Sequence, residues 1–208
     1  MMSSQLPNIR KSKPTKDIAD IIDALKDRVK VRHGQKNRRV SLNFQGKKQV
    51  ILLIEGHISL ARQQDLRTLS TMRAPVVLGT GVPEDQADYF IIRAISEIKY
   101  ALIPIELFNQ YLEEFNLWKQ QTANLTWMLM SYHLYNNVLI NNDHNKTARI
   151  LLDALYKEPE IVRANTTVLA YLQERTLLSR SWIMRFISDL KKSGYLETKK
   201  GILIKINK

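Results

Sequence analysis

The sequence LLSRSWIMRFISDLKKSGYL at residues 177–196 decides the fold of the C-terminal part of this chain. Ile183, Ile187 and Leu190 are spaced by four and three positions, which predicts a helix with one face packed against a core. Ser179 is placed to cap the start of this helix. The face opposite the core then carries a polar and partly basic set, namely Arg180, Ser181, Met184, Arg185 and Ser188.

The elements on either side of this helix predict a winged helix-turn-helix. TTVLAYLQER (residues 166–175) predicts a shorter helix with Leu169 and Leu172 facing inward. A tight turn joins it to the longer helix, from which Leu178 also faces inward. After the longer helix, YLETKKGILIKI (residues 195–206) predicts two strands that turn at Lys200 and Gly201. An ordinary amphipathic helix with a solvated face is the alternative, but it leaves this combination of elements as a coincidence.

The exposed side of the longer helix has the chemistry that reads DNA. Arginine can donate two hydrogen bonds to guanine O6 and N7, and an exposed N-terminal half is typical of a recognition helix in the major groove. We therefore expect four side chains to read bases, namely Arg180, Ser181, Met184 and Arg185. Five neighbours are expected to contact the DNA backbone, namely Ser179, Lys191, Lys192, Lys199 and Lys200.

The distribution of charge also indicates a polyanionic partner. The 208 residues carry a net charge of +12. Residues 1–49 hold 13 Lys and Arg against 4 Asp and Glu, residues 50–145 hold 6 against 10, and residues 146–208 hold 13 against 6. Two basic ends around an acidic middle suggest that the ends meet a polyanion. Charge alone leaves open a solvated surface with a disordered basic arm.

Composition excludes several kinds of site and location. Because the chain has no cysteine, it has no disulfide, no thiolate metal site and no iron–sulfur cluster held by cysteine. The first 16 residues are basic and polar and lack the apolar segment of a secretory signal. The most apolar stretch, LTWMLMSYHLYNNVLI (residues 125–140), is interrupted by polar residues and predicts a buried or dimerising helix. We therefore expect a cytoplasmic protein with no membrane partner.

The sequence predicts no enzyme. Its four histidines are scattered without metal-ligand spacing, and Asp143 and His144 fall in a polar stretch that predicts a solvated loop. It contains no glycine-rich phosphate loop, nucleophile elbow or paired-carboxylate arrangement. We expect no catalytic residue, no metal and no cofactor.

The N-terminal part predicts an antiparallel β domain behind a disordered basic arm of residues 1–16. DIADIIDALKDRVK (residues 17–30) predicts an amphipathic helix capped by Asp17, with an inward face of Ile18, Ile21, Ile22, Leu25 and Val29. Short β-prone runs separated by glycines fill residues 40–104, which is typical of an antiparallel roll or sandwich.

A long helical zone begins near Ile105 and has apolar residues on two faces. One set recurs at intervals near three and four, with Gln121 filling a gap, and we expect it to form a dimer seam: Leu117, Leu125, Met128, Tyr132, Tyr135 and Leu139. One unusually wide core face is the alternative. NNDHNK (residues 141–146) predicts a hinge between a domain of residues 17–140 and a DNA-binding domain of residues 141–208.

LSRSWIMRFISDLKKSGYLETKKGILIKI (residues 178–206) resembles the winged helix-turn-helix of the cyclic AMP receptor protein (CRP/FNR) family of bacterial transcription regulators. The positions that match are Leu178, Ser179, Arg180, Ile183, Arg185, Leu190, Gly194 and Gly201. The resemblance implies that Arg180, Ser181 and Arg185 face bases. The family typically has glutamate where this chain has Ser181, which implies a different preferred DNA sequence.

Upstream of this segment, the chain resembles the family in the layout of its elements more than in sequence motifs. VILLIEGHISLAR (residues 50–62) is similar to the family's strand, glycine and strand, and LIPIELFNQYL (residues 102–112) to the entry of its dimerisation helix. It implies an α+β fold, with an N-terminal antiparallel β-roll like a cyclic-nucleotide-binding domain, a long dimerisation helix and a C-terminal winged helix-turn-helix. The function implied is a homodimeric, sequence-specific DNA-binding transcription regulator, with RNA polymerase as a candidate partner.

Within the family, the chain is similar to an enterobacterial subgroup described as inhibitors of hydrogen peroxide resistance, which implies stress or virulence-type control. Ligand-binding members hold a cyclic nucleotide phosphate with a Gly-Glu-apolar-Ala turn. This chain keeps Gly79 but has Thr80 in place of the glutamate, and it offers carboxylates that would repel a phosphate, namely Glu84, Asp85 and Asp88. We expect no cyclic nucleotide. The alternative function is a ligand-sensing or protein-interaction module whose helix-turn-helix contacts a protein partner.

Overall fold

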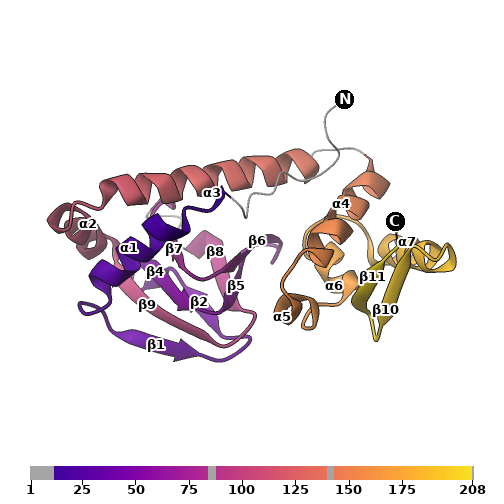
Figure 1. Cartoon of the computed structure of the whole chain (residues 1–208), viewed down its shortest axis with the longest axis horizontal. Coiled ribbons are helices and arrows are strands. Elements are labelled where there is room, and N and C mark those ends of the chain that lie inside the picture. The colour runs from indigo at the N-terminus through magenta and orange to yellow at the C-terminus, as the bar shows by residue number, and fades with distance from the viewer. Residues whose placement is uncertain (1–11, 84–87, 140–142, 208) are drawn as a thin grey trace. The chain divides into compact units, whose positions relative to one another are not determined.

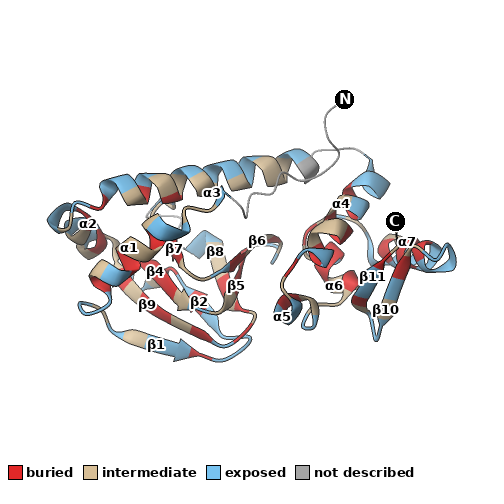
Figure 2. Ribbon diagram, viewed as in Figure 1, coloured by how far each residue is buried: buried red, intermediate tan, exposed pale blue. Residues whose placement is uncertain are grey.

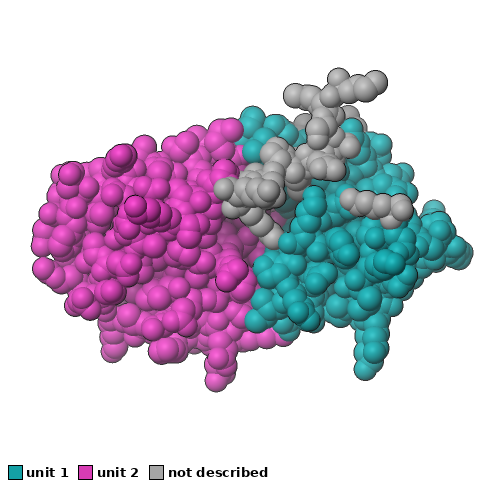
Figure 3. Space-filling view, viewed as in Figure 1, with its two compact units in different colours: residues 1–8, 133–208 teal, residues 9–132 magenta. Residues whose placement is uncertain are grey.

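The computed structural model describes residues 12–83, 88–139 and 143–207. The chain divides into two compact units, one of Ile9–Tyr132 and one that includes His133–Lys208 (Figure 3). The first unit contains two clusters of buried apolar side chains, and the second contains one. Each unit therefore has a core of its own.

The first unit is built on two sheets (Figure 1). One has the strand order β1 (Val31–Gly34), β9 (Ile98–Pro104), β4 (Lys47–Glu55) and β3 (Asn43–Phe44), and β7 (Val76–Leu78) also pairs with β4. The other has the order β2 (Arg39–Ser41), β8 (Phe90–Ala94), β5 (His57–Arg62) and β6 (Thr68–Arg73). These pairs are antiparallel, so the predicted antiparallel roll is confirmed.

Strand β4 is buried on both faces and supplies two different clusters. Ile51 and Leu53 join the cluster to which both sheets contribute. Val50 and Leu52 point the other way, into a cluster shared with helices. Because successive side chains of a strand point to opposite faces, a strand covered on both sides needs the continuous apolar run that this sequence has.

A glycine is required where β4 turns into β5. Gly56 has a φ of +92°, and a Cβ atom there would lie 2.2 Å from the carbonyl oxygen of Glu97. A side chain would therefore need both an unfavourable backbone conformation and a displaced neighbouring turn.

Strand β1 was not predicted by the sequence. Arg32 and His33 are exposed, and Gly34 is the buried residue of the strand. In this sheet β1 lies at the edge and pairs with β9. A charged edge strand lacks the alternation of apolar and polar residues that marks a half-buried strand.

Helix α1 (Thr15–Leu25) begins two residues earlier than predicted. Pro14 occupies the cap position and the helix start has no side-chain cap hydrogen bond, so the prediction that Asp17 caps this helix is wrong. Asp17 lies in the first turn, where its negative charge interacts favourably with the positive end of the helix dipole. The predicted inward residues Ile18, Ile21, Ile22 and Leu25 are buried, and Val29 packs against the same cluster beyond the end of the helix.

The last residues of the predicted disordered arm are ordered, whereas residues 1–11 lie outside the described chain. Lys13 donates a hydrogen bond of 2.5 Å to the carbonyl oxygen of Arg73, and its ammonium lies 5.6 Å from the centre of the Trp127 ring. Burial lowers the pKa of Lys13 to about 8, and the nearby positive charge of Arg73 adds to that effect.

The predicted helical zone contains two helices, α2 (Ile105–Glu114) and α3 (Trp118–Leu139). Leu117 precedes α3 and is buried in the cluster with α1 and α2. Its assignment to a dimer seam is therefore wrong, because its side chain is already enclosed by its own unit. The side chain of Leu139 lies outside the described part of the structure.

The other predicted seam residues differ in exposure along α3 (Figure 2). Leu125 and Met128 are half-buried, and Met128 packs against the roll cluster. Tyr135 is also half-buried, against the cluster of the second unit. Tyr132 is exposed, as are Leu129 and Met130. Across the described residues, no helix is long and apolar enough to cross a membrane.

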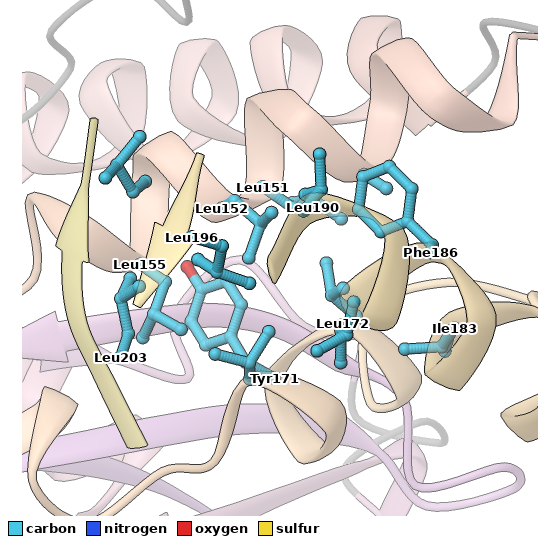
Figure 4. Close-up of a cluster of buried hydrophobic side chains, with 14 residues drawn as sticks. Leu151, Leu152, Leu155, Tyr171, Leu172, Ile183, Phe186, Leu190, Leu196 and Leu203 are labelled. Atoms are coloured by element: carbon cyan, nitrogen blue, oxygen red, sulfur yellow. The ribbon is translucent and has the colours of Figure 1, made fainter. Parts of the chain in front are cut away.

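The second unit follows as helices and a hairpin (Figure 1). Its elements are α4 (His144–Tyr156), α5 (Glu160–Arg163), α6 (Val168–Gln173), α7 (Arg180–Lys192), β10 (Leu196–Lys199) and β11 (Ile202–Ile206). Figure 4 shows their shared core, in which Leu151, Leu152 and Leu155 of α4 meet side chains of α6, α7 and the hairpin.

The polar stretch before α4 is part of the fold. The Asp143 carboxylate accepts a hydrogen bond of 3.0 Å from the backbone N–H of Lys146 and so caps α4. His144 is the first helical residue, and its ring lies edge-on to Trp182 with 6.0 Å between the ring centres. Asp143 and His144 are exposed, as predicted, but the prediction of a loop is wrong because the two residues cap and begin α4. Residues 140–142 of the predicted hinge lie outside the described chain.

Candidate nucleic-acid interface

Helix α7 is fixed to the second unit by its apolar side. Ile183, Ile187 and Leu190 are buried, as predicted, and Phe186 is buried with them (Figure 4). Trp182 stacks on Phe186, with ring centres 5.2 Å apart and an angle of 15° between the planes. Aromatic stacking and apolar packing therefore hold one side of the helix and set the direction of the other.

Ser179 caps α7, as the sequence predicted. Its hydroxyl accepts a hydrogen bond of 3.2 Å from the backbone N–H of Trp182. The Ser181 hydroxyl lies 3.1 Å from the same oxygen, and either hydroxyl can be the donor. The two serines thus form a small polar cluster at the N-terminal end of α7, where backbone N–H groups favour a negatively charged ligand.

The predicted base-reading residues lie together on the outer side of α7. Arg180, Ser181, Met184 and Arg185 are all exposed, as is Ser188. Within the described residues, the guanidinium groups of Arg180 and Arg185 have no ion-pair partner. Their donors are therefore available to a ligand. Lys191 and Lys192 are exposed in the last turn.

The predicted wing is the hairpin of β10 and β11. Lys200 and Gly201 have φ values of +51° and +80° and form its turn, a conformation that matches the twist of the flanking strands. Lys199 and Lys200 are exposed. The structure therefore brings the predicted backbone-contact residues into one unit with α7, on the helix ends and on the hairpin tip.

The wing is also tied to the start of α6, which the sequence did not reveal. The backbone N–H of Val168 donates to the carbonyl oxygen of Gly201 at 2.8 Å, and Thr167 forms a β-bridge with Ile202. Thr167 also caps α6 by accepting a hydrogen bond of 3.1 Å from the N–H of Ala170. These bonds orient the hairpin tip relative to the two-helix motif.

One arginine of this unit is buried in the fold, and a second, exposed one lies over an aromatic ring. Arg175 is buried, lies 3.7 Å from the centre of the Tyr171 ring, and donates to the Tyr171 carbonyl oxygen at 3.4 Å. Arg149 lies over Tyr195 at 4.9 Å. The four-residue spacing of Tyr171 and Arg175 is a signal that could have revealed the first pair. Counting basic residues therefore overstates the charge that a polyanion meets.

In the first unit, β7 and the turn after it are held by side chains of helix α3. The Gln121 side-chain amide donates to the Thr80 hydroxyl at 2.7 Å, and that of Asn124 donates to the Val77 carbonyl oxygen at 3.0 Å. The Asp88 carboxylate accepts a hydrogen bond of 2.8 Å from Asn43. Glu84 and Asp85 lie outside the described residues. Among those described, no group of three or more His, Cys, Asp or Glu side chains could hold a metal ion.

Comparison with known proteins gives a family match for the second unit and relatives that cover 76% of the chain. Residues 145–208 match the family model described as winged helix-turn-helix DNA binding. Two relatives are named inhibitor of hydrogen peroxide resistance. The protein from Salmonella typhimurium is 29% identical over 159 residues, which are 76% of this chain and 76% of that one. The protein from Escherichia coli K12 is 28% identical with the same coverage.

Solved structures share the fold across both units. The c-di-GMP-responsive regulator CLP from Xanthomonas campestris has a TM-score of 0.74 at 17% identity, covering 91% of this chain and 100% of that one. A mutant of CooA from Carboxydothermus hydrogenoformans has a TM-score of 0.66 at 15% identity, covering 91% of this chain and 90% of that one. A CRP/FNR-family transcriptional regulator from Thermus thermophilus has a TM-score of 0.57 at 14% identity, with coverages of 85% and 94%.

These findings confirm the resemblance inferred from the sequence, including its likeness to the proteins named inhibitor of hydrogen peroxide resistance. The matches to CLP and to CooA each cover 91% of this chain. This chain therefore has the fold of the CRP/FNR-family regulators and ends in a winged helix-turn-helix of the DNA-binding type.

Proposed function

We propose that this chain is a homodimeric, sequence-specific DNA-binding regulator of transcription that acts in the cytoplasm without gating by a cyclic nucleotide. The observation that carries the proposal is the outer side of α7. It presents Arg180 and Arg185 without ion-pair partners in the described chain, on a helix whose other side is buried. A rigid helix with free guanidinium groups suits the fixed pattern of acceptors in the major groove.

The proposed contacts are of two kinds: some select the base sequence, and others position the protein on the DNA backbone. Arg180, Ser181, Met184 and Arg185 meet base edges, and each well-formed arginine fork to guanine discriminates by about 1–3 kcal/mol. Ser179, Lys191, Lys192, Lys199 and Lys200 meet the DNA backbone and add affinity for any sequence. RNA polymerase is the further partner that a regulator of transcription engages.

The proposed dimer rests on α3. Leu129, Met130 and Tyr132 are large side chains that remain exposed on this helix, and an exposed apolar strip is typical of a surface that a partner covers. A second copy is the proposed partner, because it would place two recognition helices on half-sites about 34–36 Å apart. Sedimentation equilibrium tests this, since Leu129→Lys should shift the wild-type dimer toward monomer.

Independence from cyclic nucleotides is proposed from the turn after β7. Thr80 stands where the ligand-binding pattern has a glutamate, and Gln121 already bonds its hydroxyl. Isothermal titration calorimetry with cyclic AMP and cyclic GMP should therefore give no heat of binding; a micromolar site would contradict this part of the proposal.

The relatives named inhibitor of hydrogen peroxide resistance support control of a stress response.

The decisive experiment measures DNA binding by fluorescence anisotropy across a series of salt concentrations. Duplexes enriched from a random library by the full-length protein serve as the specific probe, and a mixed-sequence duplex serves as the non-specific one. Arg180→Ala should reduce the preference for the specific duplex by about tenfold, because it removes one guanine contact. Lys119→Ala, an exposed charge change on α3, is the control. A shallow salt dependence with no preferred duplex would sink the proposal and favour a protein partner.

A further inference from the structure

The outer side of α7 has charged edges and an uncharged middle. At about 100° per residue, the exposed residues of its first three turns follow one another around the helix in a fixed order: Arg180, Met184, Ser188, Ser181, Arg185 and Asp189. Met184, Ser188 and Ser181 therefore lie between the two arginines. The middle of the arc holds one thioether and two hydroxyls.

Met184 is the side chain in this middle that can reach furthest. It is 48% exposed although it is apolar, and methionine adapts its shape readily to an apolar partner. The two hydroxyls are shorter, and that of Ser181 lies 3.1 Å from the capping oxygen of Ser179. Ser181 therefore shares its hydrogen-bonding capacity with the cap, and Met184 decides what the middle of the arc can contact.

The middle of the arc also lacks a carboxylate. Asp189 is the acidic residue of α7 (Arg180–Lys192), and it lies at the edge of the exposed arc, beyond Arg185 and more than one turn along the helix from Met184. Cytosine is recognised in the major groove through its N4 amino group, which needs an acceptor such as a carboxylate. The apolar feature of the major groove is the C5 methyl group of thymine. Met184 is the apolar side chain in this middle, and it fits the C5 methyl group of thymine better than the N4 amino group of cytosine.

We propose that Met184 reads the C5 methyl group of thymine, so that each half-site carries a T·A pair between the base pairs contacted by Arg180 and Arg185. This inference rests on the proposed function and deepens it by naming the base that the middle of the helix selects. Arg180 and Arg185 hold the helix in the groove, and the thioether of Met184 covers the methyl group.

The test removes the methyl group alone. Deoxyuridine pairs with adenine as thymidine does but has a hydrogen at C5. The duplex that the full-length protein enriches from a random library is made again with deoxyuridine at each thymine position in turn, and the Kd of each is measured by fluorescence anisotropy at one salt concentration. At one position per half-site, deoxyuridine should weaken binding about fourfold, the effect of leaving one methyl-sized group in water.

Three variants test whether that effect comes from the side chain of Met184. Met184→Ala should bind the thymine and deoxyuridine duplexes equally, and it should fold normally because residue 184 is exposed and alanine favours a helix. Met184→Leu should keep the fourfold difference. Ile161→Ala on α5 truncates an apolar side chain of similar exposure, 43%, away from α7, and should also keep it.

The outcomes separate this inference from the proposed function. If enriched duplexes are obtained but no thymine position responds to deoxyuridine, or if Met184→Ala retains the difference, the inference fails while sequence-specific binding stands. If the protein enriches no sequence at all, the proposed function fails, and the reading of thymine by Met184 fails with it.

Discussion

Helices α7 and α3 distribute polar and apolar side chains in opposite ways. In α7 the buried residues Ile183, Phe186, Ile187 and Leu190 are all apolar, and the exposed side is polar apart from Met184. In α3 two of the most deeply buried residues are amides, Gln121 and Asn124, whereas Leu129 is 67% exposed. One helix follows the usual pattern of a surface helix and the other reverses part of it.

The difference indicates different partners. A polar and basic exposed side attracts a charged ligand, which is the role proposed for α7. An apolar exposed side lowers its free energy by burying that side against another apolar surface, which is the role proposed for α3. The buried amides of α3 hold it to β7 and to the turn after it through hydrogen bonds to Val77 and Thr80, in addition to apolar packing.

The largest effect is expected from a substitution on the buried side of α7. Ile183→Ala removes a fully buried side chain and should lower the free energy of unfolding by about 2–5 kcal/mol, because it leaves a cavity in a close-packed core. Met184→Ala, at the next position and on the exposed side, should change it by less than about 0.5 kcal/mol. Urea denaturation followed by circular dichroism measures both; equal effects would contradict the two-sided description of α7.

The sequence predicted best which neighbouring positions of α7 are buried and which are exposed. The spacing of Ile183, Ile187 and Leu190 determined which side of α7 is buried, and the exposed residues followed from it. The same reasoning misplaced Leu117, because periodicity reports that a residue is buried but not by which surface. The capping role of Asp143 was missed, and a capping role was wrongly given to Asp17, since the exact start of a helix depends on backbone geometry that polar residues near it do not fix.

The second prediction concerns the basic tip of the wing. Replacing both Lys199 and Lys200 with Ala should weaken binding to every duplex alike and reduce the slope of log K against log salt by about 2, since each neutralised phosphate contributes about 0.9. The matched control is Lys205→Ala, an exposed lysine on the adjoining strand β11. An unchanged slope in the double variant would show that the wing tip does not contact phosphates.

The third prediction tests the polar contact between α3 and the roll. Asn124→Ala removes the 3.0 Å hydrogen bond to the Val77 carbonyl oxygen and should lower the free energy of unfolding by about 1–3 kcal/mol, because a buried acceptor loses a donor. Thr126→Ala, on the exposed side of the same helix, is the control. If urea denaturation gives the same value for both variants, the buried amides do not hold α3 to the roll.

Much of the roll could be predicted because β4 and β5 flank Gly56 and carry strong apolar runs. The contact of α3 with the roll could not be, because Gln121 and Asn124 are polar in the sequence and become core residues only when Thr80 and Val77 supply their partners. Gln121 falls on the periodic series of this helix, but periodicity does not indicate which distant group bonds a polar side chain.

The smallest effect is expected from substitutions of Ser179. They separate its role as the cap of α7 from its proposed contact with the DNA backbone. Ser179→Ala removes the cap of α7 and should lower the free energy of unfolding by about 1 kcal/mol. Ser179→Asp keeps an acceptor for the N–H of Trp182 and adds a charge that favours a helix N-terminus, so stability should be retained. The same carboxylate would face DNA phosphates, so Ser179→Asp should bind all duplexes more weakly than wild type does. A variant that is stable and binds normally would leave Ser179 a cap and remove it from the DNA backbone contacts.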